Sequence, residues 1–163
     1  MKTLLVVYHS MTGGAEQMAR AVVAGAAAEE TVSTRLLHAA EAHATDVLEA
    51  DGYVFATPEN LAAISGLMKD FFDRCYYPVL DRISGRPYAA LVCAGSDGRN
   101  AVRQIERIAT GWRLRRVAEA MITCTRAQTP EQILAPKTIA AADLDHCREL
   151  GAALASGLAT GIF

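Results

Sequence analysis

The chain has 163 residues, of which 52% are hydrophobic and 21% are charged, a composition typical of one ordered globular domain. Its formal net charge of -2 gives neither the basic face of a nucleic-acid-binding protein nor the polybasic patch that attracts an anionic membrane. Cys75, Cys93, Cys124 and Cys147 form no CxxC pair, which disfavours a zinc or iron–sulfur site. We therefore expect a single cytoplasmic domain, residues 1–163, without metal, membrane span or nucleic-acid partner.

The first part of the chain alternates short apolar runs with segments of helical hydrophobic spacing. Residues 3–8 are apolar on both faces and predict a buried strand. Residues 14–29 carry an apolar stripe that predicts a helix packed on a sheet. A β-branched strand is expected over 31–37, a short helix over 43–48 and a third strand over 51–56.

The same alternation continues to the end of the chain. Helical spacing predicts a helix over 65–83, and an apolar run predicts a fourth strand over 87–94. A helix over 98–109, a fifth strand over 116–124 and an amphipathic helix over 140–158 complete the pattern. Buried strands separated by helices are typical of a parallel sheet covered on both faces. We therefore expect an α/β fold of three layers with a doubly wound, five-stranded sheet.

Prolines mark the interruptions of this pattern. Pro58 is expected to end the third strand, and Pro78 is expected to break the helix over 65–83. The segment 125–138 is polar and contains Pro130 and Pro136, which predicts a loop or a very short helix. Two roles stay open for this segment: a lid over a ligand, or a contact with another subunit.

The loop after the first strand has the features of a phosphate site. In an open parallel sheet, ligands bind at the carboxyl ends of the strands. This loop offers hydroxyls, glycines and a helix start whose free N–H groups attract an anion. Its residues are Ser10, Met11, Thr12, Gly13, Gly14 and Ala15. It lacks lysine and arginine and matches neither a P-loop nor a dinucleotide fingerprint. The alternative is an ordinary turn in which a serine or threonine caps the helix.

Two further loops follow the third and fourth strands. The loop at 57–66 contains Pro58, after which backbone amides become available to a planar ligand. The loop at 93–99 contains Gly95 and Gly98, which allow close approach of the backbone. The alternative for each loop is a connecting turn with a helix cap. Because all three loops lie at one edge of the sheet, together they predict a ligand with a phosphate and a ring.

Two stretches resemble the flavodoxin-like family. The stretch from Tyr8 to Ala19 resembles the phosphate loop of that family. Residues 57–60 and 65–74 resemble its flavin-ring loop and the helix that follows. Within that family, the chain resembles the branch of the NAD(P)H-dependent FMN reductases and of the quinone reductases of the tryptophan-repressor-binding-protein type. The resemblance covers nearly the whole chain, and it implies the strand order 2-1-3-4-5 and an FMN cofactor.

The resemblance also implies a role for each loop. Ser10 to Ala15 would hold the phosphate of FMN. Opposite sides of the isoalloxazine ring would be lined by Pro58, Glu59, Asn60 and Leu61 and by Gly95, Ser96, Asp97 and Gly98. Ala15 replaces a hydroxyl residue that is frequent in the family, which removes a hydrogen bond worth about 1 kcal/mol net. Neither ring loop carries the aromatic residue with which carrier flavodoxins sandwich the ring.

These departures favour an enzyme over an electron carrier. The resemblance implies that carrier flavodoxins are strongly acidic proteins that dock on basic partners. A net charge of -2 gives little electrostatic steering toward such a partner. A ring without an aromatic sandwich leaves one face open to a nicotinamide or a quinone. We therefore expect a reductase that passes electrons from NADH or NADPH through FMN to a quinone, a flavin or a similar small-molecule acceptor. The alternatives are a flavodoxin-type electron carrier and a flavin-free binding module.

The sequence assigns no catalytic residue. Asp97, Glu59 and Arg99 are the polar candidates near the ring, and a solvated loop position is the alternative for each. His9 is expected to have a structural hydrogen-bonding role, and Cys93 is expected to be a buried thiol at a strand end. Relatives in the family are commonly oligomeric, so the resemblance implies a homodimer or a homotetramer.

Overall fold

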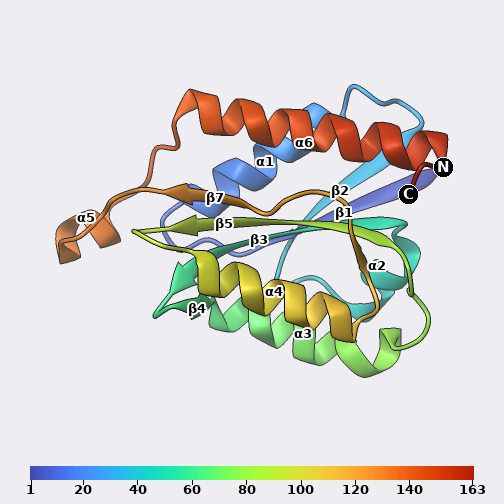
Figure 1. Ribbon diagram of the computed structural model, residues 1–163, viewed down its shortest axis with the longest axis horizontal. Helices are drawn as coiled ribbons and strands as arrows, with labels where there is room; N and C mark the ends of the chain where they lie inside the picture. The colour runs from blue at the N-terminus through green and yellow to red at the C-terminus, as the bar shows by residue number, and fades with distance from the viewer.

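A central sheet lies between two layers of helices in the computed structural model, which describes all 163 residues (Figure 1). The main strands run parallel in the order β2-β1-β3-β5, and two short strands, β6 and β7, follow at the edge beside β5. The strands of this sheet are β1 (Lys2–Tyr8), β2 (Val32–His38), β3 (Gly52–Asn60), β5 (Pro87–Ala94), β6 (Arg115–Arg116) and β7 (Met121–Cys124). With β5 as the fourth strand and β6 and β7 as the fifth, the predicted order is confirmed.

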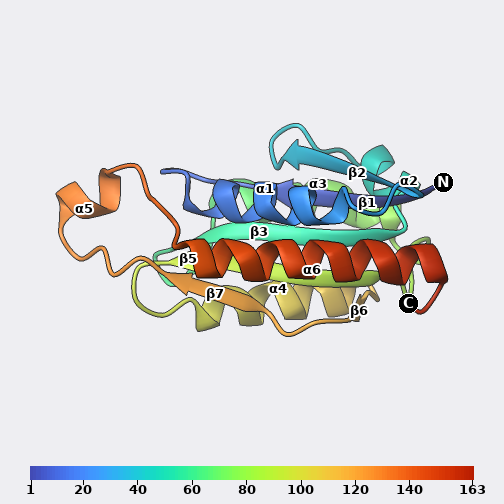
Figure 2. The ribbon, with the colours of Figure 1, turned by 90° about the horizontal axis from the view of Figure 1, so that it is seen from above.

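Five of the six helices cover the sheet. The helices α1 (Gly14–Ala26) and α6 (Ala141–Thr160) lie on one face, and α2 (Ala44–Glu49), α3 (Gly66–Val79) and α4 (Arg99–Gly111) lie on the other. The short helix α5 (Pro130–Leu134) projects beyond the carboxyl ends of the strands (Figure 2). None of these helices combines the length and the apolar composition needed to cross a membrane.

The two faces of the sheet have different cores. The face under α3 and α4 is aromatic: Phe55 packs edge-on against Phe72, with ring centroids 5.0 Å apart, and Trp112 is 2% exposed. The face under α1 and α6 is built mainly from small and aliphatic side chains. There the two helices touch through their backbones, because a Cβ added to Gly25 would lie 1.9 Å from the carbonyl oxygen of Arg148. This close packing fixes α1, and therefore the loop that precedes it.

The prediction that Pro58 ends the third strand is wrong. β3 continues to Asn60 and turns back into β4 (Ala63–Ile64), which pairs antiparallel with its last two residues. The carbonyl of Ala56 accepts from the N–H of His9, so alternate residues of β3 face β1. Pro58 therefore faces the side on which β1 has already ended, and its missing N–H removes no ladder hydrogen bond.

The predicted strand over 116–124 is split in two. Arg116 pairs with Tyr88, and Met121 pairs with Leu91, so this strand advances five residues (116 to 121) while β5 advances three (88 to 91). The two additional residues cannot be matched on β5, and they separate β6 from β7 as a bulge does. The other predicted elements are present with shifted ends. The expected break near Pro78 is confirmed, because α3 ends at Val79, one residue after that proline.

Candidate functional site

The loop between β1 and α1 leaves the start of the helix free of side-chain caps. Gly13 is the N-cap residue and has a φ of +96°, a left-handed conformation that glycine adopts without steric cost. Its N–H donates to Ser10 Oγ at 3.0 Å. The N–H groups of Gly14, Ala15 and Glu16 donate to no protein acceptor. The alternative of a turn capped by serine or threonine is therefore wrong, and three N–H groups at the positive end of the helix dipole can meet an anion.

The first residue of α1 lies directly against β5. A Cβ added to Gly14 would lie 2.4 Å from Cys93 Sγ, so a larger residue at position 14 would displace the helix start or the thiol. Cys93 is 8% exposed, which confirms the expected buried thiol. Burial raises the pKa of Cys93 to about 11, so the group stays a thiol at neutral pH.

The second predicted loop is a tight hairpin between β3 and β4. Leu61 and Ala62 form its two-residue turn with φ values of +49° and +60°, the combination of a type I′ turn. Left-handed conformations cost residues with a side chain about 1–2 kcal/mol each, so neighbouring groups must hold this turn. Asn100 Nδ2 donates to the carbonyl of Ala62, and the N–H of Ile64 donates to Gln104 Oε1 at 2.9 Å. Helix α4 therefore holds the hairpin.

Glu59 links the hairpin to the start of α4. Its Oε1 accepts from the N–H of Gly98 at 2.9 Å, and its Oε2 accepts from the N–H of Ala101 at 3.3 Å. The N-cap residue of α4 is Gly98, which has no side chain to fill this role. Glu59 was predicted to line the ring, and the structure turns its carboxylate toward α4 as a helix cap.

The third predicted loop, residues 95–98, presents an ion pair to solvent. Arg99 Nε lies 2.7 Å from Asp97 Oδ1, and both side chains are exposed. The hydrogen bond from Arg99 lowers the pKa of Asp97. Gly98 has a φ of +88°, and a Cβ there would lie 2.7 Å from Ile122 Cγ2. Ser96 is exposed next to this pair, so the loop offers polar groups and backbone to a ligand.

The structure brings the three loops together at the carboxyl ends of β1, β3 and β5, at the left of Figure 1. Asn60 Nδ2 lies 3.2 Å from Met11 Sδ, which joins the hairpin to the first loop. Glu59 joins the hairpin to the third loop, and the N–H of Arg126 donates to the carbonyl of Gly95 at 2.9 Å. The loops that the sequence placed at one edge are therefore neighbours in space.

Lys137 also lies at this edge, and sequence reasoning missed it. Its Nζ is 3.2 Å from Thr12 Oγ1, and its N–H donates to the carbonyl of Thr12 at 2.8 Å. The segment 125–138 was predicted to be a loop or a very short helix, and nothing in its pattern indicates which element it contacts. Lys137 and Thr12 are 125 residues apart in the sequence, and local sequence patterns do not indicate contacts over such a separation.

The ring of His9 does not make the structural hydrogen bond that was expected of it. Its Nδ1 is buried without a partner, and the ring packs edge-on against His38 with centroids 5.5 Å apart. Burial lowers the pKa of His9, and the neighbouring His38 lowers it further. The ring that faces His9 is that of His38 at the end of β2, and no hydrogen-bond partner reaches Nδ1.

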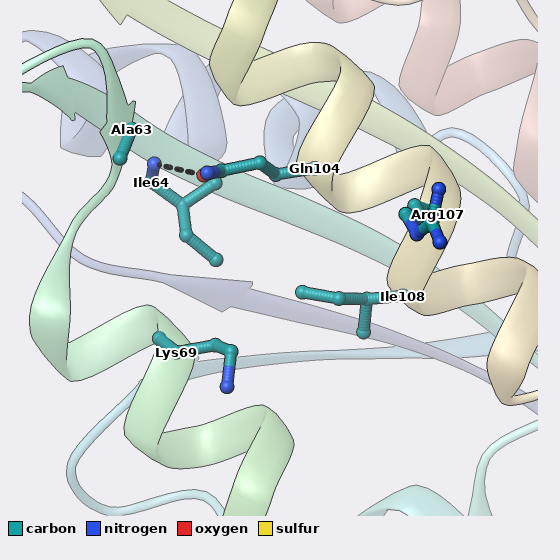
Figure 3. Close-up of a pocket in the computed structure, with 6 residues that line it drawn as sticks. All are labelled: Ala63, Ile64, Lys69, Gln104, Arg107 and Ile108. Carbon is teal, nitrogen blue, oxygen red and sulfur yellow. Dashed lines mark hydrogen bonds between the residues drawn. The ribbon is translucent and has the colours of Figure 1, made fainter.

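A separate hollow lies behind the hairpin, between α3 and α4 (Figure 3). Its volume is about 370 Å³, and its lining consists of Ala63, Ile64, Lys69, Gln104, Arg107 and Ile108. None of the predicted site residues contributes to it. The hollow therefore belongs to the helical layer rather than to the edge where the three loops meet.

The strand order and the loops at the carboxyl edge define a protein of the flavodoxin-like class. A solved flavodoxin structure from the domain Archaea superposes with a TM-score of 0.77 at 18% sequence identity, over 96% of this chain and 99% of that one. Residues 28–127 match the family described as NADPH-dependent FMN reductase. This match covers more than half of the chain, so the protein belongs to the NADPH-dependent FMN reductase family, as the resemblance in the sequence indicated.

One curated relative bears the name of an electron carrier, and another bears the name of an enzyme. A protein named flavodoxin from Aquifex aeolicus (strain VF5) is 37% identical over 98 residues, which are 60% of this chain and 53% of that protein. An NAD(P)H dehydrogenase (quinone) from Acidithiobacillus ferrooxidans is 34% identical over 45% of this chain and 47% of its own. The chain thus spans about half the length of the curated relatives that it matches.

Proposed function

We propose that this protein binds FMN at the carboxyl edge of its sheet and reduces a small-molecule acceptor with electrons from NADH or NADPH. The observation that carries the proposal is the uncapped start of α1, where the N–H groups of Gly14, Ala15 and Glu16 have no protein acceptor. This anion site lies beside the two other loops in a chain of the NADPH-dependent FMN reductase family. A phosphate and a planar ring therefore fit one continuous edge.

The residues present suit each part of FMN. The loop from Ser10 to Ala15 would receive the phosphate through backbone N–H groups and the Thr12 hydroxyl. The ring would lie between residues 58–61 and residues 95–98, with Glu59 holding the two loops together from behind. When bound, FMN supplies the redox chemistry, and the chain supplies position and electrostatics.

The open character of the ring site favours an enzyme. Leu61 stands fully exposed at the tip of the hairpin, and no aromatic side chain occurs in either ring loop. One ring face is thus left to a nicotinamide or an acceptor. The overall reaction would convert NAD(P)H, one proton and a quinone into NAD(P)⁺ and a hydroquinone, the hydride coming from the nicotinamide and the proton from solvent.

A flavodoxin-type electron carrier is the second candidate. The observation that favours it is the similarity to the Aquifex aeolicus protein, which bears the name flavodoxin. A carrier would need no access for a nicotinamide, whereas the reductase would. The two functions can therefore be separated by the response of the bound flavin to NAD(P)H.

A homodimer or homotetramer is proposed as the active form. Several apolar side chains at the carboxyl edge are exposed in the single chain: Met11 at 65%, Leu61 at 101% and Leu134 at 72%. A second subunit that covered them would complete the walls of the ring site. Light scattering on the FMN-loaded protein measures the mass, and a monomer across the working concentration range would contradict this part.

The decisive experiment is an anaerobic titration of the FMN-loaded protein with NADH and, separately, NADPH. We expect the absorbance of the bound flavin to bleach with one of the two and to return when a quinone or free flavin is added. A flavin that resists both nucleotides but stops at a stable one-electron-reduced form on stepwise chemical reduction would identify the carrier. A protein that binds no flavin at all would exclude both the reductase and the carrier, and only the flavin-free binding module would remain.

A further inference from the structure

The predicted phosphate loop has no lysine or arginine of its own, but a lysine from the far end of the chain lies against it. Lys137 Nζ lies 3.2 Å from Thr12 Oγ1. The distance is that of a weak hydrogen bond to a neutral hydroxyl. Lys137 therefore brings a positive charge to the predicted phosphate loop, whose own residues supply only neutral donors.

Hydrogen bonds of the Gln17 side chain hold the segment around Lys137 against the predicted phosphate loop. Gln17 Nε2 donates to the carbonyl of Gly13 at 2.9 Å and to the carbonyl of Lys137 at 2.7 Å. Gln17 Oε1 accepts from the N–H of Ile139 at 3.1 Å. Ile139 is 4% exposed and packs in the core under α1. The backbone on both sides of this lysine is therefore held near the loop by a buried neighbour and a bridging amide.

The charge of Lys137 has no carboxylate partner. Its ammonium donates to the carbonyls of Gln132, Ile133 and Ala135, at 2.9, 2.8 and 2.7 Å, at the end of α5. None of the ion pairs of the chain includes Lys137. Glu16, the acidic residue in the first turn of α1, pairs with Arg20 at 2.8 Å. A lysine ammonium has three protons, and the three carbonyls take all of them. Its positive charge is nevertheless not neutralised by a carboxylate and lies next to free N–H groups, where it attracts an anion. To bind a phosphate oxygen, the ammonium would exchange one of these carbonyls for it.

We propose that Lys137 is a ligand of the phosphate group of FMN and selects the phosphorylated flavin over riboflavin. The inference rests on the proposed function, since it requires FMN in this loop. A phosphate monoester carries about -1.5 to -2 charges at neutral pH. The N–H groups of α1 would meet it from one side and the ammonium from the side of Thr12. Thr12 Oγ1 donates to no protein acceptor and lies beside the ammonium, so its O–H proton is free to donate to a phosphate oxygen. The charge also makes up for the hydroxyl that is missing at Ala15.

The test compares FMN with riboflavin, which has the same ring and no phosphate. Flavin fluorescence quenching gives the Kd of each ligand for the unchanged protein, Lys137→Met and Lys137→Gln. Glutamine retains a donor for the carbonyls of α5 but has no charge. Lys2→Met serves as the matched control, because Lys2 lies at the opposite end of β1 in an exposed ion pair with Asp51. Circular dichroism confirms that each variant is folded.

We expect both Lys137 variants to bind FMN about tenfold or more weakly, as for the loss of a hydrogen bond to a charged group. Riboflavin affinity should stay within about twofold, and Lys2→Met should behave as the unchanged protein. An FMN affinity that survives in Lys137→Gln would overturn the role of the charge. Equal losses for FMN and riboflavin would show that Lys137 only supports the loop, which also overturns the inference. An unchanged protein that binds no FMN would remove the proposed function as well, so the two failures are distinguishable.

Discussion

The contact between α1 and α6 permits a sharp test, because it reverses the usual effect of a substitution. Replacing glycine by alanine inside a helix normally stabilises a protein, by about 1 kcal/mol in helix propensity. Gly25 on α1 and Gly151 on α6 lie where the two helices touch. A Cβ at Gly25 would lie 1.9 Å from the Arg148 carbonyl oxygen, and one at Gly151 would lie 2.0 Å from that of Val22. Both glycines therefore face backbone, which cannot rotate away.

The size of the effect follows from the geometry. An ordinary Cβ contact begins near 3.4 Å, so Gly25→Ala lacks 1.5 Å (3.4 minus 1.9) of space. The helices must separate by a distance of that order, and overpacking of a core costs about 1–3 kcal/mol and occasionally more. We place the cost at or above the upper end, because rigid backbone is displaced. After subtracting the propensity gain, we expect each variant to lose about 2 kcal/mol of unfolding free energy.

The assay is urea unfolding of the flavin-free protein, followed by circular dichroism. Gly111→Ala is the matched control, because Gly111 ends α4 and an added Cβ there meets no atom within 4 Å. That variant should be more stable by about 0.4–1 kcal/mol. The double variant of Gly25 and Gly151 should lose less than the sum of the single losses, since the first substitution already separates the helices. Gly25→Ala with the stability of the unchanged protein, or above it, would refute the close backbone contact.

Three further predictions concern the edge of the site. Glu59→Ala should lower the unfolding free energy of the flavin-free protein by about 1–2 kcal/mol in urea, because α4 loses the cap at Gly98. Thr12→Val should weaken FMN binding about tenfold in fluorescence titration, through the loss of a hydrogen bond to a charged phosphate. Burial lowers the pKa of His9, so the unfolded chain binds more protons. Stability contributed by His9 is thus complete above a pH of about 6.5 and is lost below it. His9→Gln should reduce that loss between pH 7 and pH 5, and the exposed His146→Gln should not.

Each of these has an outcome that contradicts it. Glu59→Gln keeps one acceptor, so it should lie between Ala and the unchanged protein, and an order in which Gln is worst would exclude the capping role. Thr12→Val that binds FMN normally would remove Thr12 from the phosphate loop. An unfolding free energy with the same pH slope in the unchanged protein and in His9→Gln would show that His9 titrates alike in both states.

The sequence predicted the strands well where both faces are buried. Leu4 to Val7 are fully buried in β1, and an apolar run of that kind has few alternatives. The hairpin at Leu61 was not predicted, because turns of type I′ are indicated by glycine or asparagine, and here leucine and alanine occupy them. Contacts from α4 offset the conformational cost of the left-handed residues in this turn. The position of α4 relative to the hairpin cannot be predicted from a local sequence pattern.

The candidate site was predicted in its location and not in its internal partners. The three loops could be placed because strand ends in a parallel sheet share an edge. The cap formed by Glu59 depends on α4, which lies 39 residues away at Gly98, and the bond from Lys137 to Thr12 spans 125 residues. Such contacts follow from tertiary packing, so composition and spacing carry no signal for them.

The contact between Gly14 and Cys93 makes the choice of residue at one position depend on the other. With cysteine at 93, a residue larger than glycine at 14 would require the thiol or the helix start to move, because an added Cβ would overlap Sγ. Were position 93 alanine, the nearest remaining neighbours of that Cβ would be the Cβ of residue 93 and Ile139 Cδ1, each at 3.5 Å, which is ordinary contact. Related chains should therefore vary at these two positions together, and a residue larger than glycine at the start of α1 should accompany a small residue at the end of β5.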